Sequence, residues 1–161
     1  MVMSEQKTEQ SKHVFDVERL YVKSSTFESF SLPKIFREEW QPEITIEIKA
    51  NNTKLDEEYY EVILVGNIKA QIYKSKETEK DKQDLYSIKV EQAGIFKIKG
   101  FDEEQNKQIL AAYCPNILYP YLRKIISDIA INASLPPVVL APINFEFLYQ
   151  QNAQPTEAAK K

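Results

Sequence analysis

The sequence contains very little glycine, cysteine and histidine. Its 161 residues include 3 Gly, 1 Cys and 1 His. Loops that cradle phosphate groups need several glycines at fixed spacing, whereas Gly66, Gly94 and Gly100 are isolated, so nucleotide-binding loops of that kind are excluded. A single cysteine cannot form a disulfide within the chain, and with one histidine it cannot supply a zinc site rich in Cys and His. We therefore expect no metal ion and no cofactor.

An excess of positive charge and long apolar runs are also absent. The chain has 21 Lys and Arg against 24 Asp and Glu, which gives a formal net charge of -3. Nucleic-acid-binding domains normally carry a basic excess, so that class is disfavoured. No apolar stretch reaches the about 18 residues that cross a bilayer, and the N-terminus lacks the apolar core of a secretory signal. We expect a cytoplasmic protein that does not insert into membranes.

Hydrophobic residues, in contrast, are abundant and make up 43% of the chain. That fraction is enough to build the core of one domain, which is also what the length favours. Residues 1–13 and 150–161 are polar and lack a periodic apolar pattern, so they are expected to be flexible tails. Residues 14–149 are expected to form a single domain.

Four segments have the composition and periodicity of β-strands. They are residues 14–27, 44–49, 59–73 and 85–99. The alternation in the first changes phase near Arg19, which fits either a bulge or a strand buried on both faces, and Ala93-Gly94 predicts a bulge in the fourth strand. Asn51-Asn52 predicts a turn, residues 74–84 form a charged run that predicts a solvated hairpin loop, and Gly100 is expected to end the fourth strand.

The apolar period then changes from two to between three and four. One stripe of a long amphipathic helix is predicted from Leu110, Tyr113, Cys114, Ile117, Leu118, Tyr121, Ile125 and Ile129. Pro115 and Pro120 lie inside this helix, so it must be kinked or restarted there. Leu135-Pro136-Pro137 ends it, and a short second helix follows Asn144. Four strands followed by two helices indicate the α+β class with a four-stranded antiparallel sheet.

The chain offers few groups for catalysis. His13 lies in the predicted N-terminal tail, where it would not be held in place as a general base. Cys114 lies on the apolar stripe of the helix, so we expect a buried, structural thiol. The carboxylates of Asp102-Glu103-Glu104 have a structural role in the first helical turn, where they favour the positive end of the helix dipole. We expect no enzyme.

Aromatic residues are in excess of what the predicted core needs. They account for 11% of the chain, and several lie in the connection after the first strand or on the short last helix. Trp40 is in that connection, whereas Phe145, Phe147 and Tyr149 are on the helix, where both faces cannot be buried in one small domain. Excess apolar surface without a catalytic group indicates an oligomer, a binding groove, or both.

Six sequence motifs resemble the SecB family of bacterial protein-export chaperones. They are Arg19-Leu20-Tyr21-Val22-Lys23 with Phe27-Glu28, Trp40-Gln41-Pro42-Glu43, Tyr60-Glu61-Val62, Gln92-Ala93-Gly94-Ile95-Phe96, Tyr113-Cys114-Pro115-Asn116-Ile117-Leu118-Tyr119-Pro120-Tyr121 and Leu140-Ala141-Pro142-Ile143-Asn144-Phe145. They occur in the family's order and span residues 14–149. The proline-interrupted helix motif and the Ala-Pro-x-Asn-Phe motif together are specific.

The resemblance implies a fold, an assembly and a function. It implies a four-stranded antiparallel sheet with one long and one short helix, assembled as a dimer of dimers. It implies an ATP-independent chaperone that binds unfolded precursor polypeptides and delivers them to the motor ATPase SecA for export. The connection that holds Trp40 resembles the family's crossover loop, which walls the groove for the client polypeptide together with the second strand and the last helix.

The resemblance also assigns three sets of residues. For the client-binding groove they are Phe27, Trp40, Ile44, Ile46, Phe145, Leu148 and Tyr149, and the alternative for each is an ordinary core position. For docking of the motor they are Ser24, Glu28, Ser87 and Lys89. For the oligomer interface of the homotetramer they are Ile88, Val90 and Gln92.

The motor-docking set departs from the family pattern. An acidic residue usually follows the lysine that matches Lys23, and here that residue is Ser24. The family's Leu-x-Glu pattern aligns with Ser87 and Lys89, so an apolar side chain is lost and a charge is reversed. A second possible function is therefore a SecB-like chaperone dedicated to one client, such as an antitoxin, with weak SecA coupling. Two further hypotheses are a purely structural oligomer and an enzyme that uses Cys114.

Overall fold

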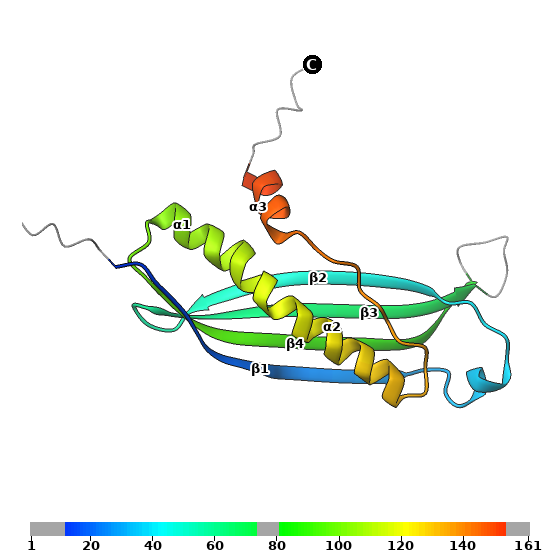
Figure 1. Cartoon of the computed structure of the whole chain (residues 1–161). Coiled ribbons are helices and arrows are strands. Elements are labelled where there is room, and N and C mark those ends of the chain that lie inside the picture. The colour runs from blue at the N-terminus through cyan, green and yellow to red at the C-terminus, as the bar shows by residue number, and fades with distance from the viewer. Residues whose placement is uncertain (1–11, 74–80, 154–161) are drawn as a thin grey trace, which may run out of the picture.

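The computed structural model describes residues 12–73 and 81–153 of the chain. In chain order the elements are β1 (Val14–Ser29), the 3-10 turn η1 (Lys34–Arg37), β2 (Glu43–Lys54), β3 (Tyr59–Tyr73), β4 (Lys82–Lys99), α1 (Glu103–Gln108), the π-helical turn η3 (Ile109–Tyr113), α2 (Cys114–Asn132) and α3 (Phe145–Ala153). The order of strands and then helices confirms the predicted α+β class (Figure 1).

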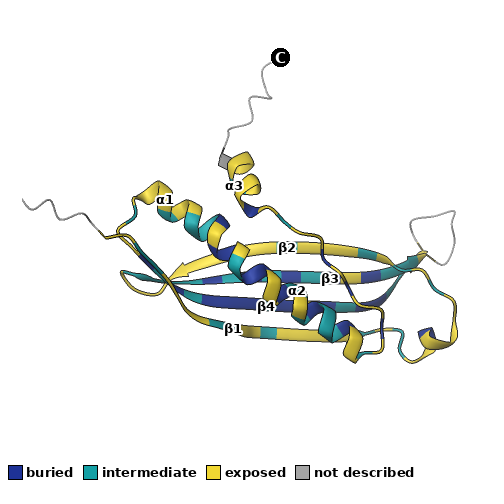
Figure 2. Cartoon of the chain, viewed as in Figure 1, coloured by how far each residue is buried: buried dark blue, intermediate teal, exposed yellow. Residues whose placement is uncertain are grey.

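The strands form one antiparallel sheet in the order β1-β4-β3-β2. Helix α2 crosses one face of this sheet, which we call the inner face; the other is the outer face (Figure 1). Successive residues of a strand point to opposite faces. On the inner face of β3 and β4 the apolar side chains are buried under α2, whereas β1 and β2 are mostly exposed (Figure 2).

Of the two predicted bulges, the structure contains one. The predicted bulge in β1 is confirmed, since its register with β4 shifts between Val17 and Arg19 and again between Val22 and Ser24. The predicted bulge at Ala93-Gly94 is wrong, because both residues are in register with β1 and β3. Gly94 has a packing reason instead: a Cβ there would lie 2.7 Å from Cε2 of Phe96.

The predicted turn at Asn51-Asn52 is also wrong. Both residues continue β2, where they pair with Ile63 and Val62, and the turn follows at residues 55–58. β2 is an edge strand, so its exposed polar side chains cost little. The hairpin loop predicted at residues 74–84 is shorter, because β4 begins at Lys82; residues 74–80 lie outside the described part of the chain. Gly100, with φ +82°, follows the last residue of β4 as predicted.

The interruption predicted at Pro115 is confirmed and lies just before that residue, whereas α2 continues through Pro120 and does not restart there. α1 begins with a capping box between Asp102 and Gln105. The π-turn η3 then widens the helix, so that Cys114 N–H bonds to the carbonyl of Ile109. Proline lacks an N–H and its ring clashes with the carbonyl four residues earlier. A wide turn directly before Pro115 relieves that clash and lets the chain continue as α2.

The predicted apolar stripe coincides in part with the face that covers the sheet. Its members Cys114 and Leu118 are buried, and Leu110, Ile117, Ile125 and Ile129 pack beside the core. Tyr113 and Tyr121 lie on the neighbouring side of the helix and are 50% and 48% exposed. The centre of the buried face is instead Leu118, Leu122, Ile126 and Ala130, which follow one another at intervals of four.

Two long connections lie at the end of the sheet where α2 ends (Figure 1). The crossover loop, residues 30–42, joins β1 to β2, and the linker, residues 133–144, runs from α2 to α3. α2 ends with Ser134 at φ 57° and a bond from Leu135 N–H to the carbonyl of Ala130. α3 extends to Ala153, so the tail predicted from Gln150 begins inside a helix. No helix of the described residues could span a membrane.

Candidate functional site

An apolar hollow lies between the crossover loop, β2 and the linker. It measures about 210 Å³. It is lined by Trp40, Pro42, Ile44, Ile46, Tyr86, Pro136, Pro137, Val138 and Val139. The period of two in β2 places Ile44 and Ile46 on the inner face, and Trp40 reaches them from the loop that precedes the strand. Three of the seven predicted groove residues therefore meet in one small hollow. None of the nine residues that line it is charged.

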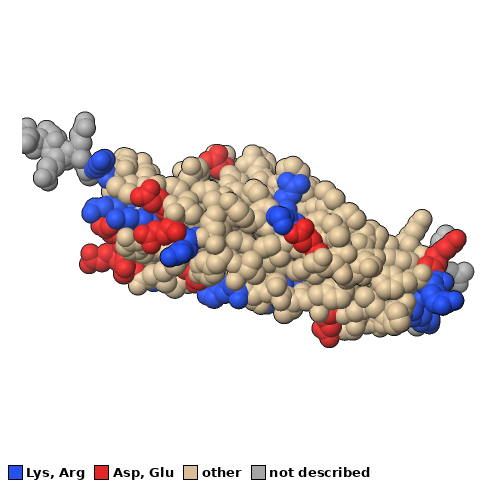
Figure 3. All heavy atoms as spheres, turned by 60° about the horizontal axis from the view of Figure 1, so that its bottom comes forward, with Lys and Arg blue, Asp and Glu red and all other residues tan. Residues whose placement is uncertain are grey.

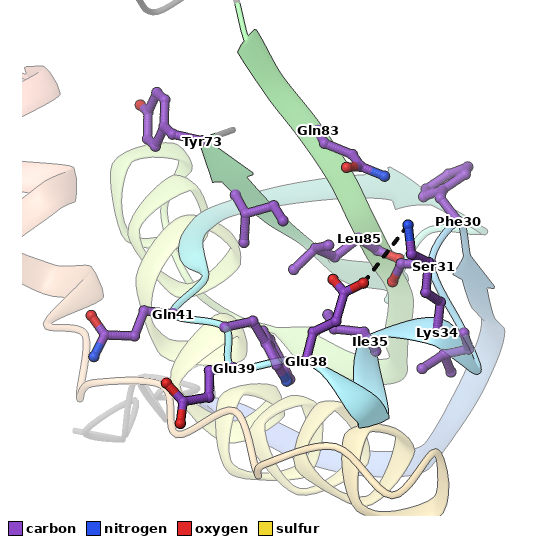
Figure 4. Close-up of a pocket in the computed structure, with 13 residues that line it drawn as sticks. Phe30, Ser31, Lys34, Ile35, Glu38, Glu39, Gln41, Tyr73, Gln83 and Leu85 are labelled. Carbon is purple, nitrogen blue, oxygen red and sulfur yellow. Dashed lines mark hydrogen bonds and ion pairs between the residues drawn. The ribbon is translucent and has the colours of Figure 1, made fainter. Parts of the chain in front are cut away.

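A larger hollow of about 540 Å³ lies on the other side of Trp40. Figure 4 shows it between the crossover loop, with Glu38, Glu39 and Gln41, and the ends of β3 and β4, with Tyr73 and Gln83. Its rim is charged, and Lys34 Nζ lies 3.7 Å from Glu38 Oε1. Trp40 lines both hollows, so this one side chain lies between the uncharged small hollow and a larger one whose lining mixes charged side chains with apolar ones such as Leu32 and Ile72.

The three predicted groove residues on α3 line neither hollow. Phe145 is buried, and its ring meets the edge of Tyr119 at a centroid distance of 5.6 Å. Leu148 is exposed and Tyr149 is half-buried. α3 stands beyond the β2 edge of the sheet and packs on η3 (Figure 1). The exposed inner face of β2 therefore lies between the small hollow and α3.

The seventh predicted groove residue, Phe27, lies at the opposite edge of the sheet. One cross-strand row on the inner face runs from Ile46 through Ile68 and Ile88 to Phe27. Ile68 and Ile88 are buried beneath α2, so they separate the two ends by about 14 Å, three strand spacings. Phe27 approaches the small hollow only through the ring of Tyr86, 6.0 Å away. It does not line the hollow with Trp40.

The four residues predicted to dock the motor do lie together. All are on the outer face, where Glu28 is opposite Ser87 and Ser24 is opposite Glu91, with Lys89 between these rows. Lys89 Nζ lies 3.5 Å from Glu91 Oε1. The positive charge that replaces the family's carboxylate is thus paired with a carboxylate two residues along the same strand.

Charge pairing extends over the rest of the outer face. The ion pairs are Lys23–Glu61, Lys49–Glu47, Lys69–Asp84, Lys97–Glu58 and Lys99–Glu58. Hydrogen bonds from Tyr21 and then Lys23 lower the pKa of Glu61, while burial and Glu61 raise the pKa of Tyr21 to about 12. No sequence signal indicated the Tyr21–Glu61 bond, which joins β1 to β3 across Ala93 of β4. Positive and negative charges alternate on this face, so it is not an acidic patch.

The predicted interface residues Ile88, Val90 and Gln92 are buried within the single chain. Each is at most 2% exposed on the inner face. A direct contact with a second copy is therefore not available to them, and any effect on assembly would act through the packing of α2. The Oε1 atom of Gln92 has no hydrogen-bond partner among the described residues. Their role in assembly stays a prediction.

A second apolar surface was not assigned from the sequence. We call it the helix flank: Tyr113, Ile117, Tyr121 and Ile125, at intervals of four along η3 and α2. It continues onto β1, because the ring of Phe15 meets Tyr113 at 4.9 Å and Val17 and Val22 are exposed. Figure 3, which brings the β1 side forward, shows charged side chains mainly toward the two ends and few between them. The predicted helix stripe was the signal for this surface.

The two candidate catalytic side chains are not placed for chemistry. Cys114 is fully buried, and burial raises its pKa to about 12. The prediction that His13 lies in a loose tail is wrong, because its ring stacks on Phe101 at a centroid distance of 4.7 Å. The described residues contain no group of three or more His, Cys, Asp and Glu that could hold a metal ion. The apolar surfaces are therefore the features left to explain.

Comparisons with known proteins identify one family. A family model described as preprotein translocase subunit SecB matches residues 8–156. Protein-export protein SecB from Alcanivorax borkumensis is 37% identical over 144 residues, which cover 89% of this chain and 88% of that protein. The protein of the same name from Psychrobacter arcticus is 39% identical over 150 residues, covering 93% and 95%. The residues matched by the family model include every segment of the site described above.

A solved structure shares the fold. It is a SecB-like chaperone from Mycobacterium tuberculosis in complex with a peptide from an antitoxin. The TM-score is 0.62 at 18% sequence identity, and the match covers 80% of this chain and 90% of that one. At this identity the likeness supports the sheet and helix arrangement alone.

We expect Cys114 to be inert toward thiol reagents in the folded protein. Its thiol is buried and its pKa of about 12 leaves little thiolate at about pH 8, where an exposed cysteine labels readily. Labelling should appear only on addition of denaturant, in step with unfolding measured by circular dichroism. Rapid stoichiometric labelling of the native protein would contradict this expectation. It would also support the hypothesis that the protein is an enzyme that uses Cys114.

Proposed function

Because this chain belongs to the SecB family of protein-export chaperones, we propose that it holds unfolded precursor polypeptides in the apolar hollow between Trp40 and β2 and delivers them to the SecA motor ATPase. It acts in the cytoplasm as a homotetramer, and it keeps its clients competent for translocation without using ATP. The fold and the family membership confirm the sequence prediction of a protein-export chaperone.

The observation that carries the binding role is the apolar lining of the small hollow. An unfolded chain offers scattered apolar side chains, and each Å² that they bury contributes about 25 cal/mol. A hollow of about 210 Å³ takes a side chain of moderate size rather than a defined ligand. The exposed inner face of β2 then extends the contact surface toward α3. Apolar contacts of this kind accept many sequences, which suits varied clients.

The helix flank supports assembly with further copies. It forms a continuous apolar surface with the inner face of β1, and removing such a surface from water is favourable. A second copy that places its own flank there would bury both surfaces through a two-fold axis, the commonest symmetry of soluble oligomers. Several grooves on one assembly would strengthen the hold on a long client through avidity.

The outer face supports a weaker, differently aligned contact with the motor. Ser24, Glu28, Ser87 and Lys89 lie together as a docking surface requires, but Lys89 is paired with Glu91. Exposed charge pairs contribute only about 0–1 kcal/mol each. Glu28 has no ion pair among the described residues and remains available. A chaperone dedicated to one client, with little SecA coupling, is the second candidate, and this charge pairing is the observation that favours it.

The client role predicts different outcomes for the same substitution at two neighbouring residues of β2. Ile46→Asp places a charge in the small hollow, whereas Thr45→Asp places the same charge on the outer face. We expect Ile46→Asp to weaken binding of a permanently unfolded polypeptide by about tenfold, or ~1.4 kcal/mol, and Thr45→Asp to leave it unchanged. Fluorescence titration measures both affinities, and thermal unfolding checks that both variants fold. Equal affinities in the two variants would remove the hollow from the client site.

Trp40→Ala tests the same hollow from the crossover loop. The variant should slow the aggregation of an unfolded protein less effectively than the unmodified chaperone. Phe36→Ala is the matched control, since Phe36 is exposed on the same loop but lines neither hollow. A control that loses as much activity as Trp40→Ala would point to the loop as a whole instead of the hollow.

Assembly should depend on the helix flank. Tyr121→Asp places an uncompensated charge in the proposed interface, so we expect the tetramer to dissociate into dimers or monomers. Asn116→Asp, at an exposed position of the same helix, should remain tetrameric. Light scattering coupled to size exclusion gives the masses. A monomeric unmodified protein would overturn the proposed homotetramer.

The motor contact should strengthen when the family's charges are restored. Lys89→Glu combined with Ser24→Asp adds two carboxylates to one patch, so we expect binding to a SecA with a basic docking tail to tighten by up to about tenfold at low salt. The gain should disappear at high salt. Lys124→Glu with Asn116→Asp makes the same charge change on α2 and should have no such effect. Equal binding of the unmodified and double-variant proteins would contradict a docking role for these positions.

A further inference from the structure

The linker between α2 and α3 is held to the body of the protein by very few polar contacts. Leu135 and Val138 are buried in its first half, and in its second half Leu140 is buried and Ile143 packs beside the core. Among the described residues, one hydrogen bond reaches residues 136–143, and it is the bond from the Tyr119 hydroxyl to the carbonyl of Ala141. Ala141 itself is exposed, so no packing of its own side chain fixes it.

Tyr119 is built into the core and reaches the linker from there. It lies on α2, 6% exposed, and its ring meets Phe145 edge to face. Arg123 Cζ lies 5.7 Å from the centroid of the same ring. Burial raises the pKa of the hydroxyl, so it keeps its proton at neutral pH and donates to the carbonyl. One side chain thus contacts both the linker and the first residue of α3.

α3 depends on these contacts for its position. It has nine residues, and isolated helices of that length are marginal in water. Of its first eight residues only Phe145 is buried, and Phe147 and Leu148 are exposed. The Asn144 side chain caps it by accepting a bond from Phe147 N–H. The cap starts the helix, and the contact of Phe145 with Tyr119 places it on the body together with the packing of α3 on η3 and of Tyr149 on the core.

We propose that Tyr119 is a positioning residue for the client site, holding the linker wall of the small hollow and α3 in place through the Ala141 carbonyl and the Phe145 ring. The proposal rests on the proposed function, in which the hollow and α3 contact the client. Tyr119 itself lines neither hollow. By holding the wall in one conformation before the client binds, Tyr119 lowers the conformational entropy that the wall loses on binding.

The hydroxyl can be removed without disturbing the core. Tyr119→Phe retains the ring and its contact with Phe145, so the loss is confined to one hydrogen bond. Tyr60→Phe is the matched control, because it removes a hydroxyl from a half-buried tyrosine of β3 that has no hydrogen bond within the described residues and lines neither hollow. Tyr119→Leu removes both the hydroxyl and the ring, and should have the larger effect.

Two measurements on the full chain test the proposal. In the client-free protein, we expect amide hydrogen exchange in residues 138–149 to be about three- to tenfold faster in Tyr119→Phe, the range that one neutral hydrogen bond gives. Exchange in β3 and β4 should not change. The affinity for a permanently unfolded polypeptide, such as reduced and carboxymethylated lactalbumin, should fall by a similar factor through faster dissociation.

Each outcome separates the proposal from the function it rests on. Unchanged exchange in residues 138–149, or faster exchange with unchanged affinity, would overturn the positioning role. Equal effects in Tyr60→Phe would do the same. If the unmodified protein does not bind the unfolded polypeptide at all, the proposed function fails, whereas faster local exchange in Tyr119→Phe would still support the hold on the linker.

Discussion

The structure depends on one helix covering a sheet that is wider than the helix. α2 packs on β3 and β4, and it comes so close that a Cβ on Gly66 would lie 2.9 Å from Cδ1 of Ile126. Four strands spread over about 14 Å between the outer axes, whereas a helix with its side chains is about 10 Å across. The two central strands are therefore buried and the inner faces of the two edge strands are not. That mismatch leaves apolar surface along both edges.

The two edges receive different neighbours. In the row from Ile46 to Phe27 both end residues are partly exposed, at 45% and 36%, although the two between them are buried. At the β2 edge the crossover loop and the linker enclose a small hollow with Trp40, which suits single apolar side chains of a client. At the β1 edge the surface continues flat onto the helix flank, and a flat apolar surface suits a second copy. One geometric constraint thus supports both the binding role and the proposed assembly.

The sequence predicted what local periodicity controls. The class, the four strands, the interruption near Pro115 and the short last helix follow from patterns within a few residues, and the structure confirms them. Of the residues that the resemblance assigned to the groove, Trp40, Ile44 and Ile46 lie together in one hollow. Phe27 lies at the other edge of the sheet, because which edge a strand occupies depends on the strand order β1-β4-β3-β2, and no local pattern encodes that order. The bond from Tyr119 to Ala141 could not be predicted either, because it joins residues 22 apart in the chain and no local pattern encodes it.

On the outer face, the strands fix where the predicted docking residues lie, but their charges decide how strongly a charged partner is attracted. The strands place Glu28, Ser24 and Lys89 side by side regardless of their charges, because register depends on the backbone and the buried inner face. A basic partner that approaches this face must compete with Lys89 for Glu91 and with Lys23 for Glu61. The existing pairs reduce the net field at the surface, so long-range attraction weakens more than short-range contact does. Docking on this face would therefore depend on the carboxylate of Glu28 and on shape, and be less sensitive to salt than docking on an acidic face.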